Sequence, residues 1–122
     1  MKNVLVVDDS QIMRNIVKNS FAALDIPCRF LEATNGKDAL NQLEENKIDL
    51  VLLDWNMPKL SGIEFLKRVR DDERYTQLPV IMVTSEAAKY NVVEALQAGA
   101  TDYIIKPVNE QKFREKISKI KL

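Results

Sequence analysis

The feature that most constrains this chain is the alternation of short, largely apolar runs with longer segments of helical periodicity. Five runs are spaced along the sequence: Asn3–Asp8, Arg29–Thr34, Ile48–Asp54, Pro79–Thr84 and Thr101–Lys106. Four of them are continuous and rich in β-branched residues, which is typical of strands in a parallel sheet covered by helices on both faces. The second run mixes polar and apolar residues, and this pattern predicts an edge strand.

Helical patterns fill the intervals between these runs. The first pattern predicts one helix face formed by Ile12, Met13, Ile16, Val17, Ser20, Phe21 and Leu24, which recur at spacings of three and four. Shorter patterns predict helices over Gly36–Glu45, Gly62–Arg70 and Glu86–Gln97, the last of which stops at Gly99. A final helix is marked by Phe113, Ile117 and Ile120.

Five strand–helix units predict an α/β fold. We expect a flavodoxin-like (βα)5 three-layer sandwich whose parallel five-stranded sheet has the order 2-1-3-4-5, because this order places the mixed second strand at an edge. The length of 122 residues suits one domain, so a single domain over residues 1–122, with no output domain, is expected. In sheets of this class, ligands bind at the carboxyl ends of the strands.

Composition excludes several classes of function. The chain has no histidine, which excludes Ser-His-Asp triads and histidine metal sites, and its single cysteine, Cys28, fits a cytoplasmic location. Eighteen Lys and Arg balance eighteen Asp and Glu, so charge gives no argument for binding to nucleic acid or to a membrane surface. No apolar run approaches the ~20 residues of a membrane helix. Any chemistry must therefore use carboxylates, hydroxyls, lysine or a hard cation.

Polar side chains gather at the carboxyl ends of four predicted strands. In chain order they are Asp8 and Asp9, then Asp54, then Thr84 and Ser85, and finally Lys106 and Pro107. Taken singly, each has an ordinary structural explanation: Asp9 or Ser10 as a helix cap, Asp54 as a turn residue, Thr84 or Ser85 as another cap, and Lys106 as a solvated cation. Their convergence on one rim of the sheet favours a functional site instead.

Three clustered carboxylates are unfavourable without a counterion. Two like charges ~4 Å apart repel by roughly 1–4 kcal/mol, and Lys106 offsets only one of the three. The excess negative charge favours a divalent cation, and a small all-oxygen site suits Mg²⁺. Because Mg²⁺ commonly acts beside phosphate oxygens, phosphoryl chemistry becomes the leading hypothesis.

These residues resemble the response-regulator receiver family, and in particular its single-domain chemotaxis (CheY-like) members. The likeness covers essentially the whole chain and rests on five segments in family order: Asp8-Asp9-Ser10, Asp54-Trp55-Asn56-Met57-Pro58 with Gly62, Thr84-Ser85, Gly99-Ala100 and Lys106-Pro107. The residues Asn56 and Glu86, which flank the site, match the chemotaxis pattern. Ser85 is larger than the common alanine, and Val108 stands where chemotaxis members often have phenylalanine, which leaves the packing of the target-binding face open.

The resemblance implies a role for each matching residue. Asp54 would be the phosphoacceptor, and Asp9, Asp54 and the backbone carbonyl of Asn56 would ligate Mg²⁺, with Asp8 acting through a water molecule. Lys106 would pair with Asp54 or a phosphoryl oxygen, and Thr84 would donate its hydroxyl to the phosphoryl group. The peptide bond between Lys106 and Pro107 is expected to be cis.

The resemblance also implies a switch and its partners. Thr84 would move toward the phosphoryl group and vacate space for Tyr103, which alters the surface of the fourth helix, fifth strand and fifth helix. The expected partners are a histidine kinase as phosphodonor, a downstream target such as the flagellar motor switch, and a phosphatase; the chain itself is expected to be monomeric and to catalyse only its own phosphorylation and dephosphorylation.

Several alternatives stay open from sequence. The chain fits an intermediate of a phosphorelay, or a receiver excised from a larger regulator. A haloacid-dehalogenase-like phosphatase also has an Asp nucleophile at a strand end, but it requires a second Asp two positions later, where this chain has Asn56. A flavodoxin-like FMN carrier needs a hydroxyl- and glycine-rich loop in place of Asp8-Asp9-Ser10-Gln11.

Overall fold

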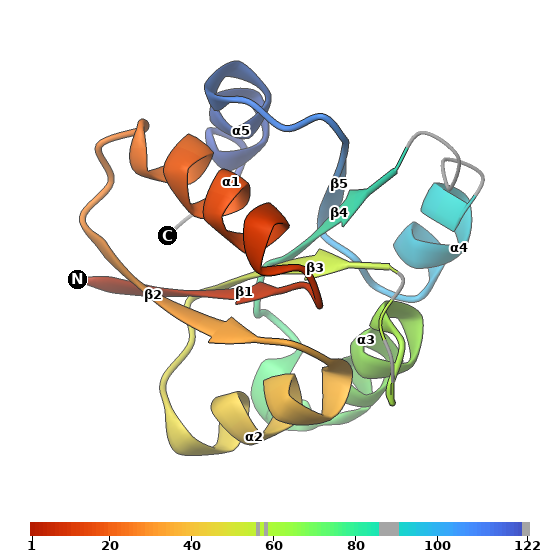
Figure 1. Ribbon diagram of the computed structural model, residues 1–122. Helices are drawn as coiled ribbons and strands as arrows, with labels where there is room; N and C mark the ends of the chain where they lie inside the picture. Colours follow the sequence, from red (N-terminus) through yellow and green to blue (C-terminus); the bar gives the residue numbers. More distant parts are fainter. Residues whose placement is uncertain (56, 58, 86–90, 121–122) are drawn as a thin grey trace.

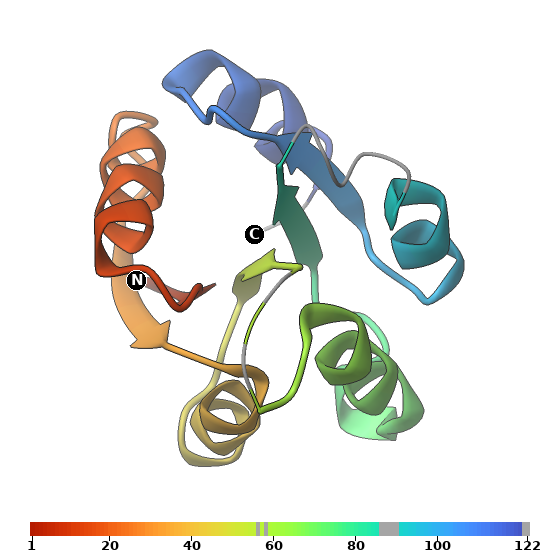
Figure 2. The same ribbon diagram turned by 45° about the vertical axis from the view of Figure 1, so that its right-hand side comes forward.

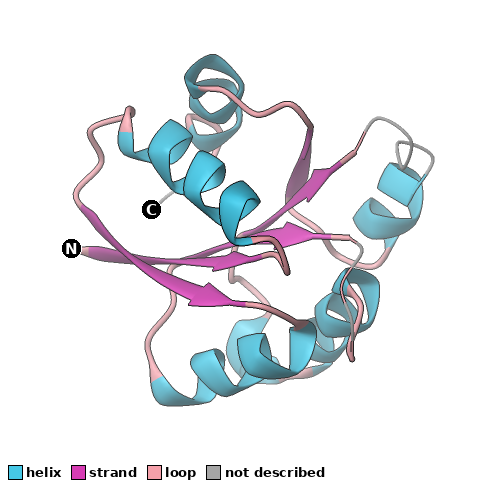
Figure 3. Cartoon of the chain, in the orientation of Figure 1, coloured by secondary structure: helices cyan, strands magenta, loops and turns pink. Residues whose placement is uncertain are grey.

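The computed structural model describes residues 1–55, 57, 59–85 and 91–120, which form a sheet between two helical layers (Figures 1 and 3). Strands and helices alternate strictly in the described chain. They are β1 (Lys2–Val7), α1 (Gln11–Ala22), β2 (Cys28–Ala33), α2 (Gly36–Glu45), β3 (Leu50–Asp54), α3 (Gly62–Asp71), β4 (Val80–Thr84), α4 (Asn91–Gln97), β5 (Asp102–Ile105) and α5 (Glu110–Ile117). A short 3₁₀ helix, η1 (Glu73–Tyr75), which the sequence patterns did not predict, lies between α3 and β4.

The sheet has the predicted topology. Its order is β2-β1-β3-β4-β5 and every neighbouring pair is parallel. The exposed Arg29 and Glu32 confirm that β2 is an edge strand. Because all strands run the same way, their carboxyl ends and the loops that follow them share one rim of the sheet (Figure 2).

Two apolar cores hold the three layers together. Successive side chains of a strand point to opposite faces, so the central strands must be apolar at every position. Val6 packs in the core beneath α1 and α5, with Phe21 and Phe113, whereas its neighbour Val7 packs in the core on the other face, with Phe65 of α3. Figure 1 shows the same division, with α1 and α5 on one face of the sheet and α2 and α3 on the other. This double covering explains the continuous apolar runs of the sequence.

The predicted apolar face of α1 is only partly correct. Val17 and Phe21 are buried, but Ile12 and Ile16 are 75% and 41% exposed. The stripe that packs against the sheet follows spacings of four through the partly buried Met13 and the buried Val17 and Phe21. Each residue before a stripe member is turned about 100° away from it around the helix. Ile12 and Ile16 therefore lie on the flank of the helix and not on the face that packs against the sheet.

The fourth helix ends at Gln97, as the sequence pattern predicts. The predicted fourth helix is described only over Asn91–Gln97, and residues 86–90 lie outside the described part of the chain. Gly99 follows it with φ of 110°, a backbone conformation that favours glycine.

No helix among the described residues has the length and apolarity needed to cross a membrane.

Candidate metal-binding site

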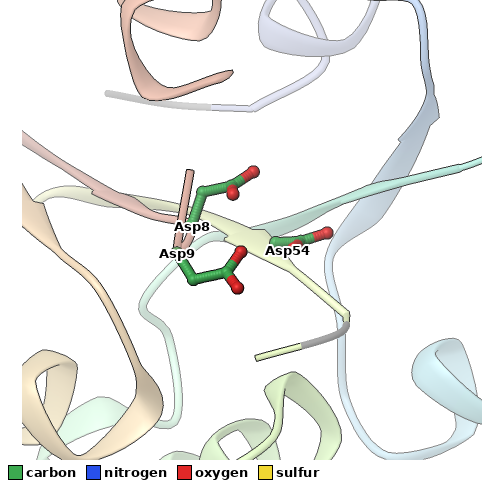
Figure 4. Close-up of side chains that lie close together, drawn as sticks. All are labelled: Asp8, Asp9 and Asp54. Atoms are coloured by element: carbon green, nitrogen blue, oxygen red, sulfur yellow. The ribbon is translucent and has the colours of Figure 1, made fainter. Parts of the chain in front are cut away.

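Three carboxylates converge at the carboxyl ends of β1 and β3. Asp54 is the last residue of β3, and Asp8 and Asp9 follow β1 directly. The register pairs Val7 with Leu53 on the adjacent strand, so the topology brings Asp8 beside Asp54. One oxygen from each carboxylate lies within 4.8 Å of the other two, and Figure 4 shows all three groups pointing to the same side. The sequence prediction that these residues meet at one rim is confirmed.

The cluster combines buried and exposed acids. Asp8 and Asp54 are only 4% and 9% exposed, whereas Asp9 is open to solvent. Burial raises the pKa of Asp54, and the charge of Asp8 raises it further, against the opposing effect of Lys106. Asp54 thus carries its negative charge at an energetic disadvantage that a bound cation would relieve.

Lys106 reaches the carboxylates from the loop that follows β5. Its Nζ atom lies 3.3 Å from Asp54 Oδ1 and 3.5 Å from Asp8 Oδ2. The peptide bond between Lys106 and Pro107 is cis, as expected. One ammonium therefore faces two buried carboxylates, which leaves net negative charge in the cluster.

A hydrogen-bonded frame holds the Asp8–Asp9 loop in place. The backbone N–H of Ser10 donates to Asp8 Oδ1 at 2.9 Å, and Ser10 Oγ caps α1 by accepting from Met13 N at 3.2 Å. Arg14 Nη1 donates to the Asp8 carbonyl at 2.8 Å, while Arg14 Nε pairs with Glu32 Oε1 of β2 at 2.9 Å. Arg14 was not among the predicted site residues. Its position one turn after the Ser10 cap was the available signal, because a long side chain there can reach back to the preceding loop.

Gly62 allows the chain to pass close to the backbone of Asp54. A Cβ atom at this position would lie 2.3 Å from the Asp54 carbonyl oxygen and 3.1 Å from the Trp55 Cα. The N–H of Gly62 donates to the Trp55 carbonyl at 3.0 Å, which closes the loop after β3. The glycine in the sequence motif is thus explained by packing against the strand end that carries Asp54.

Thr84 places a hydroxyl at the end of β4, the strand next to Asp54. It is 2% exposed, and its Oγ1 has no hydrogen-bond partner among the described residues. A buried hydroxyl without a hydrogen-bond partner costs the folded state free energy. An acceptor that enters the site could accept a hydrogen bond from this hydroxyl and remove that cost. An anion with several oxygens beside Asp54 is the kind of acceptor that this donor suits.

The remaining predicted site residues differ in their exposure to solvent. Ser85 and Tyr103 are half-buried, and Pro107 is exposed. The ring of Tyr103 lies under the ammonium of Lys116, with Nζ 4.6 Å from the ring centroid. Asn56 and Glu86 lie outside the described residues.

Val108, whose effect on the target-binding face the sequence left open, is buried in the core beneath α1 and α5. Its side chain therefore packs beneath these helices and is 8% exposed.

Comparisons with known proteins agree with this geometry. Residues 4–118 match the family described as the response regulator receiver domain. Chemotaxis protein CheY of Pseudomonas aeruginosa is 44% identical over 117 residues, which cover 96% of this chain and 94% of that protein. Chemotaxis protein CheY1 of Helicobacter pylori is 44% identical over 115 residues, covering 93% and 92%. Among solved structures, chemotaxis protein CheY4 of Vibrio cholerae has a TM-score of 0.86 at 30% identity, with 99% of each chain covered.

Proposed function

The chain belongs to the response regulator receiver domain family, whose members are signalling domains and not classical enzymes, and from that premise we propose that a phosphoryl group accepted on Asp54 switches its partner binding. The observation that carries the proposal is the convergence of three carboxylates within 4.8 Å, beside the ammonium of Lys106. This arrangement is unfavourable for stability alone and favourable for metal-assisted transfer of an anionic group.

The donor set of the cluster fits Mg²⁺. Asp8, Asp9 and Asp54 offer only oxygen atoms, which hard cations prefer, and too few of them to replace all the water around a small ion. We assign direct ligation to Asp9, Asp54 and the carbonyl of Asn56, and contact through water to Asp8. Mg²⁺ held by these groups would supply positive charge that offsets the charge of the carboxylate and phosphoryl oxygens together.

The proposed reaction needs an external phosphodonor, because a chain without histidine cannot form a phosphohistidine of its own. A carboxylate oxygen of Asp54 attacks the phosphorus of a phosphohistidine on a kinase. The new P–O bond forms as the P–N bond breaks, and the departing imidazole keeps the electron pair and takes up a proton. Lys106 and the Thr84 hydroxyl face the oxygens of the transferred group, where they stabilise its charge.

The switch uses the same threonine. When the Thr84 hydroxyl turns to the phosphoryl group, the space it leaves admits the ring of Tyr103, and the surface along α4, β5 and α5 changes. A bias of a few kcal/mol between two packings is sufficient for such a switch. The names of the chemotaxis relatives support a role in chemotaxis. For that role we propose the flagellar motor switch as the target and a phosphatase that resets the signal.

The mass of the intact protein tests the proposal. Wild-type protein incubated with acetyl phosphate and Mg²⁺ should gain the mass of one phosphoryl group, and EDTA should prevent the gain. The Asp54→Asn variant is the matched control, because it keeps the size of the side chain and removes the nucleophile. A wild-type protein that never gains this mass would contradict the proposal.

A second experiment separates acceptance of the phosphoryl group from its readout. Thr84→Ala should still become phosphorylated but lose most phosphorylation-dependent affinity for its target, because the methyl group cannot donate to the phosphoryl oxygens. Binding of wild-type and Thr84→Ala protein to a flagellar motor switch protein is measured with and without beryllofluoride. Equal affinities of the two activated proteins would rule out this role for Thr84.

A further inference from the structure

Lys112, in the first turn of α5, is hydrogen-bonded to the backbone on both sides of Lys106. Its Nζ atom donates to the Ile105 carbonyl at 3.0 Å and to the Pro107 carbonyl at 2.8 Å. The backbone N–H of Lys112 also donates to Asn109 Oδ1 at 2.9 Å, so its main chain is fixed by the helix cap. One side chain therefore clamps the two peptide carbonyls that flank the lysine of the proposed site.

We propose that Lys112 is a positioning residue that fixes the loop carrying Lys106 and thereby sets the reach of the Lys106 ammonium into the site. The inference rests on the proposed function, because Lys106 acts on the phosphoryl group there. In this proposal Lys112 does not contact the phosphoryl group.

Among the described residues, the loop has few other anchors at this point. The N–H of Lys106 donates to the Thr84 carbonyl at 2.7 Å, which extends the ladder between β5 and β4. Pro107 has no N–H, so its backbone can be hydrogen-bonded only through its carbonyl. The next fixed point is the buried side chain of Val108. The ammonium of Lys112 holds the segment between these two points.

The contacts of the Lys106 ammonium are sensitive to the position of this loop, because they are already long. The Lys106 ammonium approaches its two carboxylates at 3.3 and 3.5 Å, compared with about 2.7–2.9 Å for an optimal charge-assisted hydrogen bond. A small retreat of the loop would lose both contacts. Outer-shell groups that orient reacting or ligating side chains have large effects for this reason.

Affinity for beryllofluoride, a phosphoryl mimic, tests the inference. Trp55 is the only tryptophan of the chain and adjoins Asp54, so its fluorescence can report binding in the presence of Mg²⁺. Lys112→Met should weaken binding about tenfold, a loss typical of removed outer-shell partners. Lys112→Arg keeps the charge and the donors and should retain most of the affinity. Lys119→Met removes one charge from an exposed lysine near the end of α5 and should bind like the wild type.

A double-mutant cycle distinguishes positioning from general support of the fold. If Lys112 acts through Lys106, then adding Lys112→Met to Lys106→Met should cause no further loss of affinity. Thermal unfolding of each variant identifies any loss of fold. Should Lys112→Met fail to fold, Lys112→Gln, which retains a neutral donor, is expected to show a smaller loss that also vanishes in the Lys106→Met background.

Two results would overturn the inference while leaving the proposed function intact: affinity unchanged by Lys112→Met, or a loss that persists without Lys106. A wild-type protein that binds no beryllofluoride in the presence of Mg²⁺ would instead count against the proposed function itself, and this inference would fall with it.

Discussion

At the scale of single residues, the carboxyl group of Asp54 lies where its charge is disfavoured. Burial, followed by the neighbouring charge of Asp8, raises its pKa above the ordinary value of 3.8. A raised pKa means that the folded state binds this proton more readily than the unfolded state does. The folded protein therefore loses stability as the pH rises through the interval between the unfolded and folded pKa values, and the full penalty is present above that interval.

Neutralising this residue should stabilise the protein in the absence of metal. In EDTA at pH 7 we expect Asp54→Asn to raise the free energy of unfolding by about 1 kcal/mol, because the variant no longer buries a charge and no longer repels Asp8. This corresponds to a rise in Tm of about 3–6 °C. Saturating Mg²⁺ should stabilise the wild type more than the variant, because only the wild type has the complete ligand set.

Thermal unfolding with EDTA and with Mg²⁺ measures both effects. The stability advantage of the variant should shrink as the pH falls through the folded pKa toward 3.8 and disappear below it. A variant that is less stable than the wild type in EDTA at pH 7 would show that the carboxylate has a structural role.

At the scale of elements, helix α1 ties the acidic loop to the edge strand β2. Arg14 and Lys18 both pair with Glu32, at 2.9 and 3.2 Å, and Arg14 also holds the Asp8 carbonyl. Burial tends to raise the pKa of Glu32, but the hydrogen bonds and charges of the two cations outweigh it, so the pKa is lowered. The edge strand thus contributes to the frame of the site although it carries no site residue.

Removing this link should have a small, pH-dependent effect on stability. Since 39% of the Glu32 side chain is exposed, Glu32→Gln should lower the free energy of unfolding at pH 7 by only about 0.5–1 kcal/mol. A lowered pKa stabilises the folded state above the ordinary value of 4.5, and this contribution is lost as the pH falls through the folded pKa.

Urea unfolding between pH 7 and pH 3 measures the difference between wild type and Glu32→Gln. Glu45→Gln is a suitable control, because Glu45 is exposed on α2 and has no ion pair within the described ranges. A difference that is independent of pH would show that the charge of Glu32 is not its source.

Strands and helices could be predicted from the sequence where a single hydrophobic periodicity dominated the segment. The buried strands and the edge character of β2 follow from the apolar runs, because a sheet covered on both faces allows little else. The error in α1 arose because Ile12 and Ile16 share the spacing of the buried stripe, and sequence spacing alone does not say which of two overlapping stripes faces the sheet. The position of Arg14 one turn after the Ser10 cap indicates that its side chain can reach the preceding loop, but its contact with the Asp8 carbonyl depends on how helix and loop pack.

At the scale of the whole molecule, a parallel sheet accounts for the meeting of residues far apart in sequence. Asp8 and Lys106 are 98 residues apart, yet the strand order brings their side chains to 3.5 Å. The sequence therefore predicted which residues share the rim, because strand ends in this topology converge. It could not predict their burial, the approach of Gly62 to the Asp54 carbonyl, or the clamp by Lys112, since these depend on three-dimensional packing.

The central claim is that the carboxylate of Asp54 accepts a phosphoryl group. Identification of the modified residue by peptide mapping tests this claim most directly. Protein treated with acetyl phosphate and Mg²⁺ is reduced with borohydride, which converts an aspartyl phosphate to homoserine, and is then digested and sequenced by mass spectrometry. Homoserine should appear at position 54, and only when both the donor and Mg²⁺ are present. Homoserine at Asp8 or Asp9 instead, or at no position, would contradict the account.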